Sequence, residues 1–159
     1  MADKATGSTS ASVFLDEIKA SMGGSLNYEP ADTTQKWVFA EQSVNSNANL
    51  LTASNDTIDD GTAIAVGDTY KWICIKNMSS TSTDGIGLSM DGGDPSSISL
   101  ADGIYLGAGE MVILKPINLT VELLHAASVT MDGTYGYPSA TNASAVTVQV
   151  AAIIDTDVG

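Results

Sequence analysis

Aspartate–glycine pairs recur in this chain and could supply the oxygen ligands of a calcium loop. The densest run lies in residues 84–114, "DGIGLSMDGGDPSSISLADGIYLGAGEMVIL". An EF-hand needs oxygen-bearing side chains at its first, third and fifth positions, glycine at the sixth and a carboxylate at the twelfth. Counted from Asp91, the third and fifth positions are Gly93 and Pro95. The pattern therefore indicates hairpin turns, in which Asp-Gly is favoured because both residues tolerate positive φ.

A second acidic run, "NDTIDDG", places three aspartates close together in the sequence, at Asp56, Asp59 and Asp60. Counted from Asp56, the third and twelfth positions are Ile58 and Gly67, so this run is not an EF-hand either. A weak cation site formed by the three carboxylates stays open as an alternative to a solvated turn.

Residue types that carry catalysis or bind zinc are scarce in this chain. His125 is the only histidine and Cys74 the only cysteine, so neither a zinc site nor an internal disulfide has enough ligands or partners. No serine near His125 lies on a nucleophile elbow. Glu110 is the one carboxylate of the 84–114 run that lies outside the aspartate turns. We therefore expect no enzymatic activity and no cofactor, and we expect Cys74 to be a small buried hydrophobe.

The charge of the chain excludes one large class of partner. Nineteen acidic residues stand against six basic ones, giving a formal net charge of −13, and all six basic residues are lysines. Proteins that bind nucleic acid need clustered positive charge for the phosphates and usually arginine for the base edges. We therefore expect no nucleic-acid partner. The sequence also has no apolar run near the roughly 18 residues of a membrane span, and its start lacks a secretory signal pattern, so synthesis in a cytoplasm is expected.

The elements that position these residues fall into two parts, an arm over residues 1–36 and a β-domain over residues 37–159. In the arm, "SVFLDEIKASMGG" predicts a short amphipathic helix that Ser12 could cap. Its apolar stripe, proposed as a partner-binding surface, consists of Phe14, Leu15, Ile18 and Met22. Such a short helix is marginal alone, so it must dock either on its own domain or on a neighbouring molecule.

From Trp37 onward the apolar residues alternate with period two, and turn residues interrupt them often. This pattern predicts an all-β fold, an antiparallel β-sandwich. The predicted strands are Trp37–Glu41, Asn49–Ala53, Ala63–Val66, Tyr70–Asn77, Gly85–Met90, Ser97–Leu100, Ile104–Leu106, Met111–Leu114, Leu119–Leu124, Ser128–Met131 and Val146–Ile154.

Several stretches together carry a resemblance to a known family. A strand ending in "IKN", then "GIGLSMDGG", "ISLADGIYLGAGE" and "MVIL", resembles jelly-roll virion proteins of tailed marine and cyanobacterial phages. The arm followed by "KWVFAEQ" is similar to small structural proteins of the same phages, and the likeness runs from about Thr6 to Leu114, with the final strand "AVTVQVAAIID".

The resemblance implies a jelly-roll fold and a role as a capsid cement or decoration protein on the virion surface. It implies the major capsid protein as partner and a homotrimer, since closed symmetry suits a lattice site. Two alternatives stay open: a tail, neck or fibre component of the virion, and a carbohydrate-binding or adhesin-like module. For the last of these the candidate stacking aromatics are Trp37, Trp72, Tyr105, Tyr135 and Tyr137.

Overall fold

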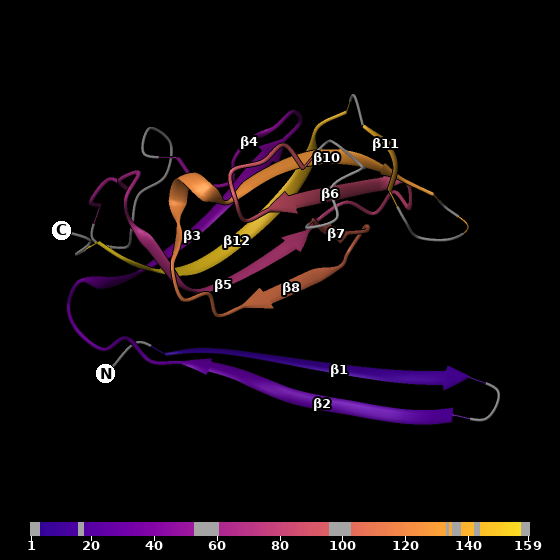
Figure 1. Cartoon of the computed structure of the whole chain (residues 1–159), viewed down its shortest axis with the longest axis horizontal. Helices are drawn as coiled ribbons and strands as arrows, with labels where there is room; N and C mark the ends of the chain where they lie inside the picture. The colour runs from indigo at the N-terminus through magenta and orange to yellow at the C-terminus, as the bar shows by residue number, and fades with distance from the viewer. Residues whose placement is uncertain are drawn as a thin grey trace.

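The protein is built almost entirely of antiparallel β-strands, as the sequence predicts (Figure 1). The computed structural model describes residues 4–15, 18–52, 61–95, 103–132, 134, 138–141 and 144–156. Its strands are β1 (Ala5–Leu15), β2 (Ile18–Tyr28), β3 (Gln35–Val44), β4 (Ala48–Asn49), β5 (Thr69–Asn77), β6 (Asp84–Ser89), β7 (Ile104–Leu106), β8 (Met111–Leu114), β9 (Leu119–Thr120), β10 (His125–Met131), β11 (Pro138–Thr141) and β12 (Val146–Asp155). One short 3-10 helix, η1 (Val121–Leu123), follows β9.

Two five-stranded sheets form the body of the molecule. One sheet has the order β3-β12-β5-β8, with β9 pairing to β5, and the other has the order β11-β10-β6-β7, with β4 pairing to β10. Strand β12 is central in its sheet, because it pairs with β3 along ten residues on one side and with β5 on the other. Strands far apart in the sequence are therefore direct neighbours, as in other antiparallel sandwiches.

The main hydrophobic core lies between the two sheets. Alternate residues of β5 and β12, such as Ile73, Ile75 and Val150, are fully buried there against Ile86 and Leu88 of β6. Since successive side chains of a strand point to opposite faces, the residues between them lie on the outer face of the β3-β12-β5-β8 sheet. That outer face turns toward the hairpin formed by β1 and β2 (Figure 1).

The predicted N-terminal helix is wrong, because residues 5–15 and 18–28 pair as two antiparallel strands in continuous register from Ala5↔Tyr28 to Leu15↔Ile18. The segment is rich in serine, threonine and glycine, which are poor helix formers, and Gly23 and Gly24 continue β2 instead of ending an element. Within the part of the chain that the structure describes, no helix is long and apolar enough to cross a bilayer.

Most predicted strands of the body are confirmed, and two have the predicted bounds, β7 (Ile104–Leu106) and β8 (Met111–Leu114). The prediction at 63–66 is wrong, since only a single bridge residue occurs there, and Val121–Leu123 are helical where a strand is predicted. Strand β11 (Pro138–Thr141) is not predicted by the sequence pattern. The predicted strand at 97–100 lies outside the described residues. The predicted domain boundary at 36/37 falls two residues inside β3.

Candidate functional site

The Asp-Gly turn at Asp91 is structural. Its carboxylate accepts hydrogen bonds from the Ser89 hydroxyl and from the Gly93 N–H at 2.8 Å, and Gly92 has a φ of 78°. These hydrogen bonds hold the pKa of Asp91 below its usual value of 3.8. The prediction of turn chemistry at this position is therefore confirmed.

The other candidate chemical groups are not brought together. His125 Nδ1 lies 2.9 Å from the Asn47 Oδ1 on the β10 side of the sandwich, whereas Cys74 lies on the outer face of β5 in the opposite sheet. Glu110 accepts a hydrogen bond from the Gly107 N–H at 2.7 Å, which closes the turn before β8. Among the residues that the structure describes, no three His, Cys, Asp or Glu side chains are placed to share a metal ion. Asp56, Asp59 and Asp60 lie outside those residues.

The tryptophans lie beneath the hairpin rather than on an open binding surface. Trp72 is buried and Trp37 is partly buried, and their rings pack edge to face with centroids 6.0 Å apart. Tyr105 is half-buried. The remaining candidate aromatics, Tyr135 and Tyr137, lie outside the described residues.

The root of the hairpin packs on the outer face of the β3-β12-β5-β8 sheet and forms a second, smaller apolar cluster. Its fully covered members are Ala5, Trp72 and Ile153, and its partly buried members are Leu26, Tyr28, Trp37, Cys74, Ile113 and Ala151. The Trp72 Nε1–H donates a hydrogen bond to the Leu26 carbonyl at 3.3 Å. Lys115 donates one to the Asn27 carbonyl at 3.1 Å, with its ammonium 5.3 Å from the centre of the Tyr28 ring.

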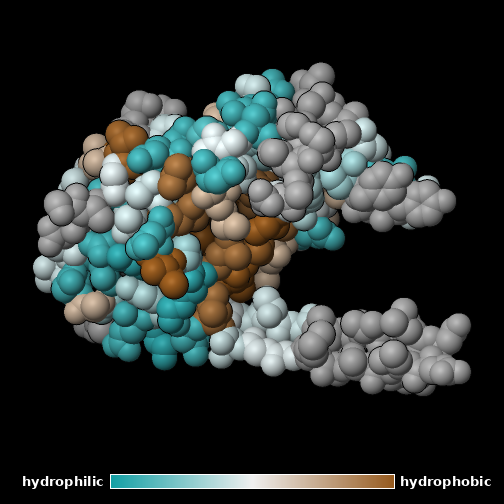
Figure 2. Space-filling view, in the orientation of Figure 1, coloured by the Kyte–Doolittle hydropathy of each residue, from teal (hydrophilic) through white to brown (hydrophobic). Residues whose placement is uncertain are grey.

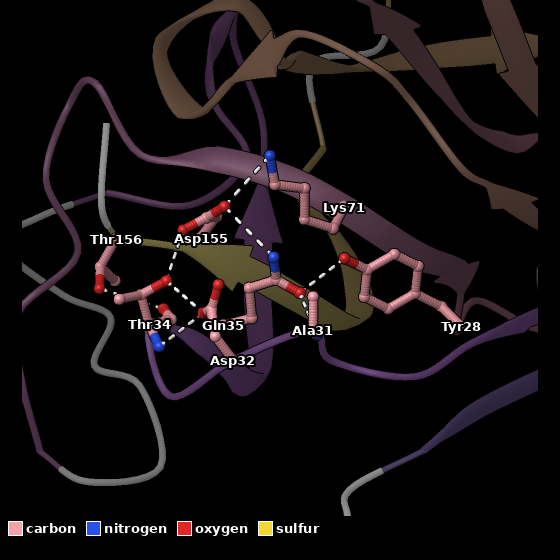
Figure 3. Close-up of polar contacts among 8 residues, drawn as sticks. All are labelled: Tyr28, Ala31, Asp32, Thr34, Gln35, Lys71, Asp155 and Thr156. Carbon is pink, nitrogen blue, oxygen red and sulfur yellow. Dashed lines mark hydrogen bonds and ion pairs between the residues drawn. The ribbon is translucent and has the colours of Figure 1, made fainter. Parts of the chain in front are cut away.

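A polar network fixes the segment that joins the hairpin to β3 (Figure 3). The Tyr28 hydroxyl donates to Gln35 Oε1 at 2.6 Å, and the Gln35 amide lies 3.4 Å from Asp155. Asp155, at the end of β12, also accepts from the Thr34 hydroxyl at 2.9 Å and forms an ion pair with Lys71 at 3.2 Å. Partial burial raises the pKa of Tyr28, an effect that the nearby Lys71 opposes. This network ties the hairpin to β3 and β12.

Asp32 closes the same connection as a tight turn. Its carboxylate accepts hydrogen bonds from the Thr34 hydroxyl at 2.6 Å and from the Thr34 N–H at 2.9 Å. Both bonds favour the ionised carboxylate and hold the pKa of Asp32 below its usual value of 3.8.

The four residues predicted as an apolar helix stripe are distributed over both strands of the hairpin. Phe14 and Leu15 are in β1, and Ile18 and Met22 are in β2. The side chains of these four residues lie outside the part of the structure that is described, so the partner-binding surface that they are predicted to form stays a prediction.

Beside the hairpin root, Phe39 is an exposed apolar side chain of the outer sheet face, whereas Ala151 and Cys74 in the same row pack against the root cluster. We call Phe39, Ala151 and Cys74 the outer strip, because they are direct neighbours across β3, β12 and β5. Phe39 is 71% exposed, and Ala151 and Cys74 are half-buried. Figure 2 shows apolar residues at the surface of the sandwich above the hairpin. Met111 of β8 is also exposed. Phe39 has no sequence signal of its own, although the run "WVFA" in β3 places apolar residues on both faces of that strand.

Burial raises the pKa of the Cys74 thiol, and the nearby Lys76 partly opposes the shift. Cys74 is thus a half-buried thiol on the outer face, not the fully buried hydrophobe that the sequence predicts. Its neighbours Ile73 and Ile75 point the other way, into the main core.

Taken together, the surface formed by the hairpin and the outer strip is the candidate interaction site of this protein. Comparisons with protein-family models, with curated proteins and with solved structures find no match for this chain.

Proposed function

We propose that this chain is a structural protein of a phage virion, most specifically a cement or decoration protein that binds and stabilises the assembled head. The observation that carries this proposal is the β1–β2 hairpin, which is anchored at its root and runs well past β8, the edge strand of the sheet on which it is anchored (Figure 1). An anchored arm of this kind suits a protein that bridges neighbours in a lattice, because many weak contacts of the same type add up through multivalency.

The strand order supports the jelly-roll part of the proposal. Eight strands taken in chain order, β3, β4, β5, β6, β7, β8, β10 and β12, can be numbered one to eight. The two sheets then have the orders 1-8-3-6 and 2-7-4-5. Two four-stranded sheets in these orders support a jelly roll, a fold that occurs in viral capsid proteins and also in lectins and cupins. The fold alone does not choose among those functions.

The charge distribution also suits a bridging arm. Residues 4–28 contain two lysines and two acidic residues, Lys4, Lys19, Asp16 and Glu17, so the hairpin carries no formal net charge. The acidic excess of the chain belongs to the rest of the molecule. A neutral arm can approach another protein with less repulsion than the strongly acidic body, which keeps the protein soluble.

The partners that follow from this proposal are the major capsid protein and further copies of the chain. We expect a homotrimer, because a decoration protein placed at a three-fold position of the shell completes its contacts by closed symmetry.

Electron microscopy of the particle that encodes this chain tests the proposal directly. We expect density for the sandwich on the outer surface of the head, with the hairpin reaching a neighbouring subunit. Heads that lack the protein should open at a lower temperature and recover when the purified full chain is added. Density confined to the tail or neck would favour the alternative virion location, and absence from the particle would overturn the proposal.

A variant that lacks residues 1–28 separates the arm from the body in the same assay. Among the residues whose side chains the structure describes, the main core includes none from the hairpin, so we expect the variant to keep its β-sheet circular dichroism while losing the ability to stabilise heads. Retained head stabilisation by this variant would contradict a role for the arm.

A further inference from the structure

We propose that a hollow between β3 and β4 binds one residue of a neutral sugar. The hollow measures about 240 Å³ and lies where the end of β3, in one sheet, meets β4 and β10 of the other sheet. No residue of the hairpin or of the outer strip is among the described residues that line it. The inference therefore goes beyond the proposed role in the virion and does not depend on it.

Six residues that line the hollow have neutral side chains able to form hydrogen bonds. Three are amides and three carry a hydroxyl group, and they are Gln42, Asn45, Asn49, Ser43, Ser46 and Thr52. Within the described part of the chain, the side chains of Ser43, Asn45 and Ser46 form no hydrogen bond. Amides and hydroxyls both donate and accept, so they can be matched to the hydroxyl groups of a sugar, which also do both.

Charged and aromatic groups do not contribute to the hollow, although the chain has a formal net charge of −13. None of the ten described residues that line it is acidic, basic or aromatic. Phosphate and other anions need positive charge, and divalent cations need carboxylates. Flat nucleobases usually stack on aromatic rings. This lining favours a neutral ligand that is rich in hydroxyl groups.

Apolar side chains complete the lining of the hollow. Val44, Leu50 and Ala126 belong to the main core, and each is buried. A sugar ring carries hydroxyl groups around its rim and C–H groups on its faces, so it suits a site that combines hydrogen-bonding groups with apolar ones. Ligand pockets in proteins generally have this mixed lining.

The size of the hollow suits a single sugar ring. Pockets for drug-sized ligands measure roughly 300–1,000 Å³, and this hollow is somewhat smaller. Four of its lining residues, Ser43, Asn45, Ser46 and Ala48, are exposed, so the hollow opens to solvent. A longer glycan can therefore place one residue in the hollow while its other residues stay in solvent.

The backbone around the hollow is held in place by hydrogen bonds that leave the Asn45 side chain unused. Ser128 of β10 donates to the Asn45 carbonyl through its N–H at 3.1 Å and through its hydroxyl at 2.6 Å. The Leu50 N–H donates to the Leu124 carbonyl at 2.9 Å, and β4 pairs with β10. A site that is formed in advance loses less conformational entropy when a ligand binds.

NMR titration of the full chain tests the inference with four probes, the methyl glycosides of glucose, galactose, mannose and N-acetylglucosamine. We expect at least one of them to shift the side-chain amide signals of Asn45 and Asn49. Its dissociation constant should be on the order of 1 mM, from the usual affinity per atom of small ligands. Glucose 6-phosphate should bind more weakly than a neutral glycoside because the hollow offers no positive charge. Cyclohexanol, which lacks most of the hydroxyl groups, should cause no shift.

Two variants and a matched control assign the binding to the hollow. Asn45→Ala should weaken binding of the same glycoside about five-fold, because it removes the amide and keeps the carbonyl to which Ser128 donates. Ala48→Leu should abolish binding by filling the hollow, and the exposure of Ala48 lets the fold accept the larger side chain. Asn118→Ala is the control, since Asn118 is an exposed asparagine between β8 and β9 that does not line the hollow. The backbone amide spectrum of each variant checks that its fold is kept.

Three results of the titration would overturn the inference. They are the absence of shifts at the hollow with all four glycosides up to about 100 mM, equal weakening by Asn118→Ala and Asn45→Ala, and equally tight binding of glucose 6-phosphate or cyclohexanol. Asn45→Ala should stabilise heads as well as the unchanged chain does. Loss of head stabilisation in this variant would identify the hollow as a capsid contact and would also overturn the sugar site. Absence of the protein from the particle would leave the titration unaffected.

Discussion

The two faces of the β3-β12-β5-β8 sheet are buried in different ways. Its inner face packs against a whole second sheet and contributes fully buried residues such as Ile75 and Val150 to the main core. Its outer face carries the root of a two-stranded hairpin, and Phe39 beside that root is exposed. The inner contact defines the fold, whereas the outer contact buries far fewer residues.

Truncating one residue on each face of this sheet should give the largest difference in the free energy of unfolding. Ile75→Ala removes a fully buried side chain from the main core and should lower the free energy of unfolding by about 2–5 kcal/mol. Ile113→Ala, on the outer face and only half-buried, should cost clearly less. Denaturant unfolding followed by circular dichroism measures both. Equal losses of unfolding free energy would mean that the apolar cluster at the hairpin root is as important to the fold as the main core.

Forcing the hairpin away from the sheet should have an intermediate effect. Gly7→Leu places side-chain atoms where Ile113 lies and should cost about 1–3 kcal/mol through overpacking. Both tryptophans of the chain belong to the apolar cluster at the hairpin root. Their fluorescence should therefore shift to the red when the hairpin moves away, while the circular dichroism of the sandwich stays unchanged. The raised pKa of Cys74 slows its alkylation, and Gly7→Leu should speed that reaction.

Gly24→Leu is the matched control for this substitution, because it adds the same side chain on the same face of the hairpin, where no atom lies within 4 Å of the added Cβ. A fluorescence shift of equal size in Gly24→Leu would show that the change reports on the hairpin's own stability, not on its contact with Ile113.

The smallest expected effect is a difference in acid sensitivity between the turn at Asp32, next to the hairpin, and the turn at Asp91 in the sandwich. The folded-state pKa values of Asp32 and Asp91 are lowered, so their stabilising contribution is present above the unfolded value near 3.8 and is lost as the pH falls through the folded values. Asp32→Asn should make tryptophan fluorescence less sensitive to pH below about 4, and Asp91→Asn should flatten the acid dependence of the sandwich melting temperature. Identical effects of the two variants on both signals would contradict separate roles for the two turns.

The body of the fold could be predicted from the sequence because each strand of the sandwich carries its own local signal. Alternation and flanking glycines gave the bounds of β7 and β8. Strand β11 has no such signal, since it begins with Pro138 and lies at the edge of its sheet, where proline is tolerated.

The hairpin could not be predicted in the same way. Phe14, Leu15, Ile18 and Met22 satisfy a helical spacing, and the same residues fit two paired strands once the chain reverses after Leu15. The pairing depends on which residues of the two strands lie opposite each other, and the spacing of apolar residues along the chain does not specify this. The composition gave the stronger signal, because serine, threonine and glycine in residues 6–12 disfavour a helix.

Only part of the candidate site could be predicted from the sequence. Apolar residues on both faces of β3 and β5 indicate strands covered on both sides. Which part of the outer face stays open depends on the path of the hairpin across the sheet, and no residue of the sheet itself encodes that path. Phe39 therefore looks like its buried neighbour Val38 in the sequence but is exposed in the structure.

The central position of β12 has a consequence for the order of events during synthesis. The hairpin is local and can form within microseconds of leaving the ribosome, but the sheet on which it docks stays split until β12 inserts between β3 and β5. Long-range pairing of this kind is slow to form. Each newly made chain therefore passes through a period in which its hairpin is complete and its own docking surface is not. The root of the hairpin can therefore cover Trp72 and Ile153 only after the last long strand of the chain has been made.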